Sequence, residues 1–410
     1  MSDRPYPTSQ TEAEQFDAAD PIAHARSRFD LPEGSVYLVG HSLGPPPRTA
    51  LRHLQQTAGQ DWATELVGSW NQADWINFPA RLGARLARLI GADPSEVTVC
   101  DSVSVNLFKM VGALIQDSPQ TQTILVESGE FPTDQYILER LAQMTDARFL
   151  RSDPGRSTDH LAPGVILVRS LVDYRTGAIA PVAKIESQAR QVGAEIVWDL
   201  SHATGVLDLT LSDWDVRYAV GCTYKYLNGG PGAHAFLYVA SDHIDTLHTP
   251  IAGWLGHARP FAFDPHYDPA QGVQRFVAGT PPILSMASLS GALDAFEGLD
   301  LADVQNKAQT LGDMCLNAFA RLGLSSVSPP IGQARGGHVS FDHPDGYAIS
   351  RALAESGCQT DFRTPSTARF GLSPLFLRYQ DVWQALEQLQ TILETESFRA
   401  TRFSVRHTVT

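Results

Sequence analysis

The feature that most constrains this chain is an alternation of short apolar runs with helical stretches from about residue 80 onward. The runs are continuously apolar, which is typical of strands buried on both faces of a parallel sheet. The sequence therefore predicts an α/β fold, with a mostly parallel sheet flanked by helices and ligands beyond the carboxyl ends of its strands. The predicted strands are 96–100, 123–126, 165–168, 196–198 and 218–220, and the predicted helices include 82–90, 136–144 and 182–192.

Two other parts of the chain have a different pattern. Residues 1–75 predict an N-terminal arm that packs with the small domain, with a short strand at 36–39 before the Pro-rich loop 45–47. Residues 301–410 predict a small C-terminal α+β domain, whose last helix carries an apolar stripe from Val382 to Leu393 behind an Asp381 cap. Residues 76–300 form the predicted large α/β domain.

Charge and composition exclude several classes of protein. With 31 Lys and Arg residues against 45 Asp and Glu, the net charge of −14 repels nucleic acid and anionic lipid, so neither is an expected partner. No apolar run reaches the roughly 18 residues of a membrane span, and the polar start lacks the order of a signal peptide, which predicts a cytoplasmic protein. The cysteines are widely spaced, so we expect buried thiols and no metal site: Cys100, Cys222, Cys315 and Cys358.

The strongest chemical signal is an acid and an amine at the ends of two successive predicted strands. Asp199 ends the run 196–198, and Lys225 follows the run 218–220, 26 residues after Asp199. Either residue alone is typical of a solvated strand end. Together they match the needs of pyridoxal phosphate, whose aldehyde bonds a lysine amine and whose ring nitrogen is kept protonated by a carboxylate.

A bound phosphate group needs a further feature, a helix N-terminus with free N–H groups. Residues 101–106 follow a predicted strand and open an apolar helix, which predicts such an N-terminus. The serines here also suit an ordinary helix cap. The acid–amine pair is what favours the phosphate interpretation.

These residues belong to a series of motifs along most of the chain. They are GHSLG (40–44), VNLFK (105–109), FPTD (131–134), WDLSHATG (198–205), GCTYKYLNGGPG (221–232), GWLGH (253–257), GTPPI (279–283), RFGLSPLF (369–376) and the terminal VRHTVT. In them the chain resembles the kynureninase family, pyridoxal-phosphate enzymes of the aminotransferase class V group with the fold type I architecture. The resemblance implies hydrolysis of L-kynurenine to anthranilate and L-alanine, and of 3-hydroxy-L-kynurenine to 3-hydroxyanthranilate, in tryptophan degradation or NAD-precursor metabolism. It also implies a homodimer with shared active sites.

The resemblance also implies roles for individual residues. Lys225 is the lysine that bonds the cofactor, Asp199 the partner of its ring nitrogen, and Tyr224 an acid–base group that reaches its phosphate. Arg369 grips the substrate α-carboxylate through its forked guanidinium. The other residues implied to contact the cofactor are Val103, Ser104, Phe131, Pro132, Thr133, Asp134, Ser170, His202, Trp254 and Thr280, the last two from a neighbouring subunit.

Three positions depart from the family pattern and bear on substrate preference. His41 stands in the GHSLG loop where the family usually has Asn, Glu130 adds a negative charge before FPTD, and Asp173 stands where His or Asn is expected. The aromatic end of the substrate is expected to meet the N-terminal arm, at His41, Trp70 or Tyr37, each of which also suits ordinary packing.

Two other functions fit the same frame. Cysteine desulfurase or selenocysteine lyase chemistry needs an exposed nucleophilic thiol on a late loop, and Cys358 is the candidate. Against this, Gly357 ends a predicted helix at 347–355 and Cys358 begins the next strand. The second alternative is an inactive binding protein, which is expected to lose a residue such as Lys225 or Arg369, and both are present.

Overall fold

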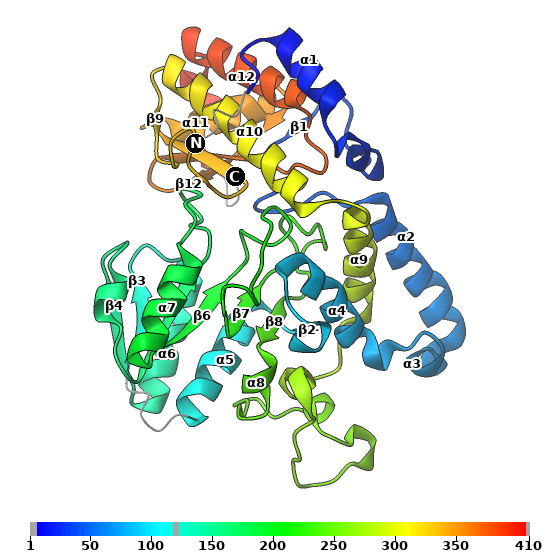
Figure 1. Cartoon of the computed structure of the whole chain (residues 1–410). Helices are drawn as coiled ribbons and strands as arrows, with labels where there is room; N and C mark the ends of the chain where they lie inside the picture. The colour runs from blue at the N-terminus through cyan, green and yellow to red at the C-terminus, as the bar shows by residue number, and fades with distance from the viewer. Residues whose placement is uncertain (1–5, 118–122, 407–410) are drawn as a thin grey trace.

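The computed structural model describes residues 6–117 and 123–406 (Figure 1). The first residues of the polar start and the last four of the VRHTVT motif lie outside this part of the chain. Across the described residues, no helix combines the length and the apolar character needed to cross a bilayer.

A seven-stranded sheet forms the centre of the large lobe. Its strand order is β2 (Val97–Val99), β8 (Phe236–Val239), β7 (Tyr218–Gly221), β6 (Glu195–Asp199), β5 (Val165–Ser170), β3 (Thr123–Glu127) and β4 (Arg148–Ser152). β8 runs antiparallel to both neighbours, and the other pairs are parallel, so the predicted mostly parallel sheet is confirmed. Sequence reasoning missed β4, whose edge position tolerates arginines, and β8, which follows β7 without an intervening helix.

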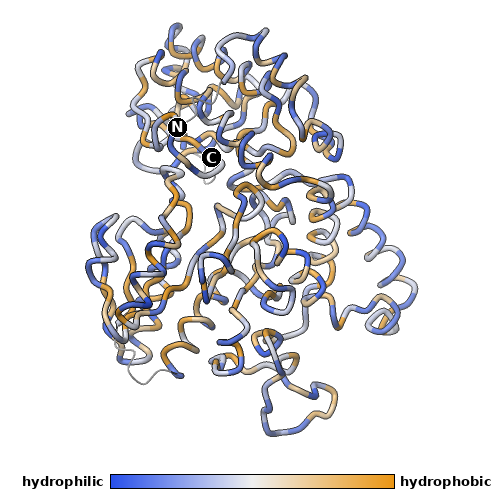
Figure 2. Tube along the Cα trace, viewed as in Figure 1, coloured by the Kyte–Doolittle hydropathy of each residue, from blue (hydrophilic) through white to orange (hydrophobic). Residues whose placement is uncertain are grey.

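Helices cover both faces of this sheet. Val197 of β6 joins the apolar core beneath α5 (Val103–Asp117) and α6 (Pro132–Thr145). The next residue, Trp198, joins the core on the other face, with α4 (Phe78–Ile90) and α7 (Val182–Val192). Figure 2 shows hydrophobic residues gathered along the central strands. Burial on both faces explains why these strands are continuously apolar.

A small lobe forms around a four-stranded antiparallel sheet. Its order is β12 (Asp361–Arg363), β13 (Thr367–Gly371), β10 (His338–Asp342) and β9 (Ser325–Ser326). This lobe stands over the carboxyl ends of the large-lobe strands (Figure 1).

The remaining helices of the two lobes and the arm are α1 (Gln10–Ala19), α2 (Arg48–Gln56), α3 (Ser69–Gln72), α8 (Ser241–Ile244), α9 (Ile283–Leu293), α10 (Leu301–Arg321), α11 (Gly346–Glu355) and α12 (Tyr379–Glu394).

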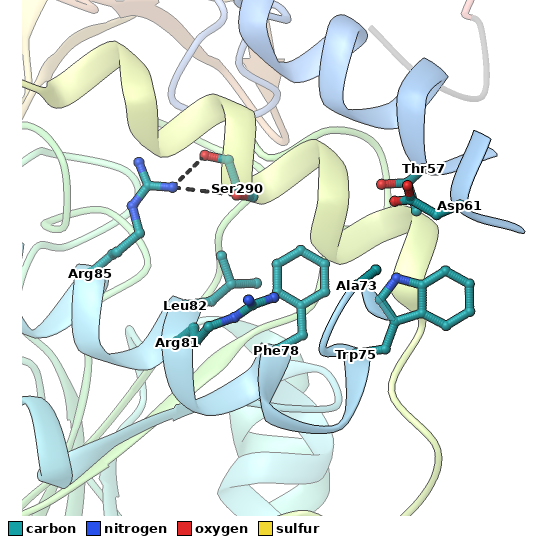
Figure 3. A pocket seen from close by; sticks show the side chains of 9 residues that line it. All are labelled: Thr57, Asp61, Ala73, Trp75, Phe78, Arg81, Leu82, Arg85 and Ser290. Atoms are coloured by element: carbon teal, nitrogen blue, oxygen red, sulfur yellow. Dashed lines mark hydrogen bonds between the residues drawn. The ribbon is translucent and has the colours of Figure 1, made fainter. Parts of the chain in front are cut away.

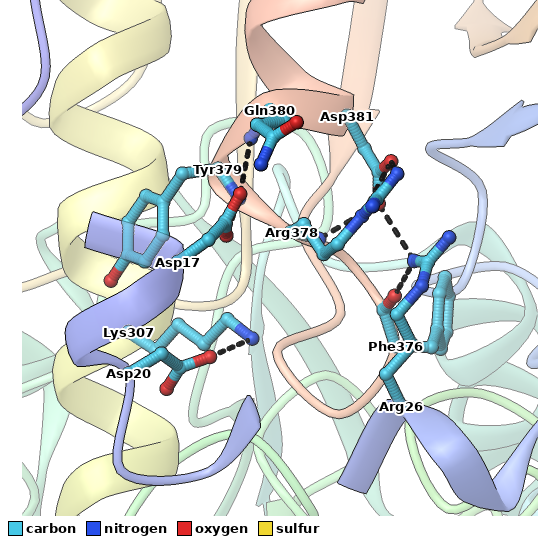
Figure 4. Close-up of polar contacts among 9 residues, drawn as sticks. All are labelled: Asp17, Asp20, Arg26, Lys307, Phe376, Arg378, Tyr379, Gln380 and Asp381. Atoms are coloured by element: carbon cyan, nitrogen blue, oxygen red, sulfur yellow. Dashed lines mark hydrogen bonds and ion pairs between the residues drawn. The ribbon is translucent and has the colours of Figure 1, made fainter. Parts of the chain in front are cut away.

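The start of the N-terminal arm lies against the small lobe, whereas α2, in the later part of the arm, contacts α9. β1 (Val36–Tyr37) pairs in parallel with β11 (Cys358–Gln359), and α1 lies beside α12. Figure 4 shows polar contacts at this junction: Asp17 accepts hydrogen bonds from the backbone N of Tyr379 at 2.7 Å and of Gln380 at 3.1 Å, and Lys307 pairs with Asp20 at 2.7 Å. The boundaries at residues 75 and 300 remain a prediction.

The predicted cap of the last helix is wrong. α12 begins at Tyr379, and its N-cap residue is Arg378. Asp381 lies inside the first turn, where its carboxylate accepts hydrogen bonds from the backbone N of Arg378 at 2.8 Å and from Arg26 at 2.7 Å (Figure 4). The helix was predicted from an apolar stripe that starts at Val382. The prediction therefore omitted the first turn, which begins at Tyr379.

Candidate active site

A cavity of about 260 Å³ lies at the carboxyl ends of β5, β6 and β7. The large lobe supplies the strand ends and the first turns of α5 and α6, and the small lobe supplies two arginines from β12 and β13. The residues that line it are His41, Ser42, Val103, Ser104, Phe131, Thr133, Asp134, Ser170, Tyr174, Asp199, Ser201, His202, Tyr224, Lys225, Arg363 and Arg369.

Lys225 and Asp199 meet in this cavity. β6 ends at Asp199, and Lys225 lies in the turn that follows the neighbouring strand β7. Asp199 is buried, and one of its oxygens accepts a hydrogen bond from the backbone N of Ser201 at 2.8 Å. The partly buried ammonium of Lys225 makes no hydrogen bond or ion pair with the residues that the structure describes. An amine without a protein partner, beside a buried carboxylate, fits the aldehyde and ring nitrogen of pyridoxal phosphate.

The phosphate end of such a ligand has a matching site. α5 begins at Val103, and the Ser102 hydroxyl accepts a hydrogen bond from the backbone N of Val105 at 3.4 Å. Ser102 is thus the capping serine, while Val103 and Ser104 face the cavity. The N–H groups of a first helical turn have no partners within the helix, so they suit an anion.

The pKa values of Asp134 and His202, which line the cavity, are shifted from their ordinary values. Burial raises the pKa of Asp134 well above its ordinary value, and the nearby charges of Asp199 and Glu130 raise it further. Burial and the ammonium of Lys225 lower the pKa of His202, whose Nδ1 is buried without a hydrogen-bond partner. His202 is therefore neutral at pH 7 and holds a free polar atom beside the cavity.

Tyr224 keeps its proton at neutral pH. The charge of Cys222 and burial raise the pKa of its phenol above the ordinary value of 10. The Tyr224 ring centroid lies 6.0 Å from the Nζ atom of Lys225. The phenol therefore carries its proton close to the amine.

Two arginines and one aspartate form the small-lobe wall of the cavity. Arg369 donates from Nε to Asp361 at 2.7 Å and from Nη2 to the second Asp361 oxygen, and its Nη1 donates to the Tyr174 carbonyl. Arg363 pairs with the same carboxylate at 3.1 Å, but its side chain is 32% exposed, against 1% for Arg369. Although burial alone would raise it, His41 and Arg369 hold the pKa of Asp361 well below its usual range. The wall therefore carries two guanidinium groups against one carboxylate.

Sequence reasoning missed Arg363. A usable signal was the alternation along a strand, because Asp361 and Arg363 are two residues apart on β12 and point to the same face. Register then places Asp361 opposite Arg369 of β13.

His41 is completely buried at the edge of this wall. Its Nε2 lies 3.4 Å from Asp361, and its ring stacks on His338 with centroids 5.3 Å apart. Burial and the charge of Arg369 lower the pKa of His41 to about 4, so the ring is neutral at pH 7. A Cβ at Gly371 would lie 1.9 Å from its Nδ1, so glycine is needed beside this histidine.

The other two departures from the family pattern lie outside the cavity lining. Asp173 accepts hydrogen bonds from the backbone N of Arg175 at 3.1 Å and of Thr176 at 2.7 Å, so it stabilises a local turn. Glu130 accepts hydrogen bonds from the backbone N of Ser170. Burial raises the pKa of Glu130 to about 7.

Five residues that were expected to contact the cofactor or the substrate do not line the cavity of a single chain: Tyr37, Trp70, Pro132, Trp254 and Thr280. Pro132 is the first residue of α6, between Phe131 and Thr133, which do line it. Trp70 of α3 packs edge-on against another tryptophan, with ring centroids 5.6 Å apart. Trp254 is 40% exposed, and Thr280 borders a separate, smaller cavity. Their roles in a shared site remain predictions.

A second cavity, of about 350 Å³, lies between α4, α9 and the π-helical segment Thr57–Glu65 (Figure 3). Arg85 is its most buried cation, and it donates to the Ser290 carbonyl at 2.8 Å and to Asp294 at 2.7 Å. The guanidinium thus holds α4 to α9. This cavity has no lysine, so the acid–amine chemistry belongs to the other one.

Comparison with known proteins identifies the relatives of this chain. Residues 304–389 match the family model described as the kynureninase C-terminal domain. A kynureninase from Pseudomonas fluorescens is 39% identical and aligns with 98% of this chain and 100% of the relative.

Solved structures show the same fold at lower identity. A C-DES mutant described with glycine covalently linked to the PLP cofactor has a TM-score of 0.80 at 20% identity, covering 89% of this chain and 98% of that one. The cysteine desulfurase CsdA from Escherichia coli has a TM-score of 0.75 at 19% identity, covering 91% and 98%. These likenesses confirm the fold type I architecture. The near full-length identity to its curated relative shows that the chain belongs to the kynureninase family.

Proposed function

We propose that this chain hydrolyses L-kynurenine to anthranilate and L-alanine with pyridoxal phosphate as cofactor, and that it also accepts 3-hydroxy-L-kynurenine. The supporting observation is that Lys225, Asp199 and two carboxylate-binding arginines line one cavity in a chain of this family. Proteins that bind pyridoxal phosphate need the first two groups, and an α-amino acid substrate needs the third.

Different residues of the cavity are proposed to bind different parts of the cofactor. The amine of Lys225 would bond the aldehyde, Asp199 would keep the ring nitrogen protonated, and the first turn of α5 would hold the phosphate at Val103 and Ser104. When bound, pyridoxal phosphate supplies an electron sink that makes the substrate Cα proton acidic. Phe131 offers an aromatic face held edge-on by Tyr174, with ring centroids 5.3 Å apart.

Substrate binding and proton transfer follow from the same geometry. Arg369 and Arg363 bind the α-carboxylate, because the buried Asp361 neutralises only one of their two charges. Lys225 Nζ, released when the substrate amine takes its place on the cofactor, would take the Cα proton, and the Tyr224 hydroxyl would serve as the nearby acid. Water adds to the side-chain ketone, the carbon–carbon bond to the aromatic carbonyl breaks, and the alanine fragment takes up a proton and leaves.

Product analysis tests this proposal. The cofactor-loaded protein, incubated with equal amounts of L-kynurenine and 3-hydroxy-L-kynurenine, is expected to yield alanine with anthranilate and 3-hydroxyanthranilate, detected by mass spectrometry. Lys225→Ala is expected to yield none and to lose the visible absorbance of the bonded cofactor. Survival of both substrates in the presence of a yellow wild-type protein contradicts the proposed substrate class.

The sulfur-transfer alternative has little support in the site. Cys358, its only late-loop candidate in the sequence, is fully buried in β11, and burial raises the pKa of its thiol to about 11. A nucleophilic cysteine needs an accessible thiolate. Formation of alanine from L-cysteine by the wild type and its loss in Cys358→Ser are the results that favour this alternative.

A homodimer is the proposed assembly. The segment after residue 250 exposes aromatic side chains, with Trp254 40%, Phe261 63% and Phe263 80% exposed, and Trp254 packs edge-on against Phe261. Exposed apolar clusters of this kind are typical of contact surfaces. Sedimentation of the purified chain as a monomer contradicts this assembly and the shared-site roles of Trp254 and Thr280. A cytoplasmic location stays a prediction of the sequence.

A further inference from the structure

Glu130 joins the loop before α6 to the end of a central strand. Both carboxylate oxygens lie 3.1 Å from the backbone N of Ser170, the last residue of β5. Ser170 pairs in register with Asp199 at the end of β6. The next residue along the loop, Phe131, lines the active-site cavity. Glu130 therefore links the loop that carries Phe131 to the strand end beside Asp199.

The charges that face Glu130 are mainly negative. Asp134 of α6 and Asp199 of β6 both interact with it, and Arg169 of β5 is a cation that acts on it. That arginine is already paired with Glu127 of β3 at 3.0 Å. Within the described ranges, Glu130 itself has no ion-pair partner.

Glu130 also borders a neighbouring cavity. It measures about 410 Å³, and its lining includes Glu130, Ser170, Asp173 and Arg175. The carboxylate of Asp173 is held in its own turn, and Arg175 lies over the ring of Tyr174 at 5.1 Å. Neither forms an ion pair with Glu130, so Glu130 borders this cavity without a paired charge from these two residues.

We propose that Glu130 is a positioning residue that sets the charge of the cofactor pocket, because its ionisation adds a negative charge next to Asp199 while its hydrogen bonds fix the Phe131 loop. The inference rests on the proposed cofactor but not on the proposed substrate. Burial raises the pKa of Glu130 to about 7, so the added charge appears as the pH rises through neutrality. A negative charge favours protonated groups nearby, so the ionised form holds the proton on the lysine-bonded cofactor to higher pH.

Absorbance titration of the cofactor-loaded protein tests the proposal without any substrate. Glu130→Gln removes the charge and keeps an oxygen for the Ser170 N–H, and Glu130→Asp keeps the charge on a shorter arm. Glu139→Gln, the same change at a site on α6 paired with Arg151, is the matched control. In Glu130→Gln the pH midpoint of the cofactor band is expected to fall by about one unit, whereas Glu130→Asp and the control stay near the wild type.

Two results overturn the proposal. One is a midpoint in Glu130→Gln that coincides with the wild type. The other is an equal shift in Glu130→Gln and Glu130→Asp, which assigns the effect to the hydrogen bonds and not to the charge. Glu130→Ala serves as a second uncharged variant, and its midpoint must fall as well. Failure to cleave kynurenine, with the expected midpoint shift present, contradicts only the proposed substrate.

Discussion

At the scale of the residue, the site is governed by buried charges that are only partly balanced. Asp361 holds the fully buried Arg369 in place with two hydrogen bonds and has a weaker contact with the more exposed Arg363. Arg369 thus has a structural role besides the proposed binding role, whereas Arg363 has the more exposed guanidinium. The two arginines are expected to respond differently to substitution.

Arg363→Ala is expected to raise KM about tenfold, because it removes a charged hydrogen-bond donor to the substrate carboxylate. Its free energy of unfolding should fall by less than about 1 kcal/mol, since the side chain is partly exposed. Arg369→Ala should lower the free energy of unfolding by about 3 kcal/mol, because Asp361 is left buried without its main partner. Steady-state kinetics and urea unfolding separate the two effects, and an unchanged KM in Arg363→Ala contradicts its role.

His41 predicts a pH dependence of stability. Its pKa is about 4 in the folded chain and 6.5 when solvated, so the unfolded chain binds more protons between these values. Stability from the neutral ring is present above pH 6.5 and lost as the pH falls toward 4, by about 3 kcal/mol. Between pH 6.5 and pH 4, the free energy of unfolding of His41→Asn, measured with urea, should fall by about 3 kcal/mol less than that of the wild type. Parallel losses in both proteins contradict the assigned cause.

The sequence predicted the site residues that directly follow apolar strands or lie in recognisable motifs. Asp199 and Lys225 were found because a carboxylate and an amine followed apolar runs, and both line the cavity. Asp361 and Arg363 were missed, because their pairing with Arg369 depends on register between two short strands of the small lobe. Long-range pairing of this kind leaves little trace in a local pattern.

At the scale of the element, a glycine lets the backbone of a helix approach the backbone of a strand closely. α4 lies against β2, and a Cβ at Gly83 would lie 2.0 Å from the Val97 carbonyl oxygen. The helical periodicity predicted α4, but not this approach, because the sequence does not show which face of a helix meets backbone. The unpredicted β8 completes the same edge, pairing with β2 on one side and β7 on the other.

Gly83→Ala is expected to lower the free energy of unfolding by about 2–3 kcal/mol, since the added methyl group forces α4 away from β2. Arg88→Ala, on the exposed face of the same helix, is the control and should change it by no more than about 0.5 kcal/mol. Chemical denaturation measures both. Equal stability of the two variants contradicts the close contact.

At the scale of the whole molecule, the start of the N-terminal arm contacts the small lobe, which carries both arginines of the cavity. Lys307 of α10 pairs with Asp20 at 2.7 Å, and their side chains are only 4% and 3% exposed. Burial lowers the pKa of Lys307, and Asp20 opposes that change. A buried pair of this kind is costly to break from one side.

Lys307→Met is expected to lower the free energy of unfolding by about 3 kcal/mol, because Asp20 stays buried without its partner. Adding Asp20→Asn removes the unpaired charge and should restore most of the loss. Urea unfolding of the single and double variants measures the coupling. Additive losses in the double variant contradict a buried pair.

The most direct test of the central claim is the fate of solvent oxygen. The cofactor-loaded protein is incubated with L-kynurenine in water enriched in oxygen-18, and the masses of both products are measured by mass spectrometry. Hydrolysis at the side-chain ketone predicts heavy oxygen in the anthranilate carboxylate and none in alanine, with no products from Lys225→Ala. Anthranilate without heavy oxygen, or alanine formed without anthranilate, contradicts the proposed reaction.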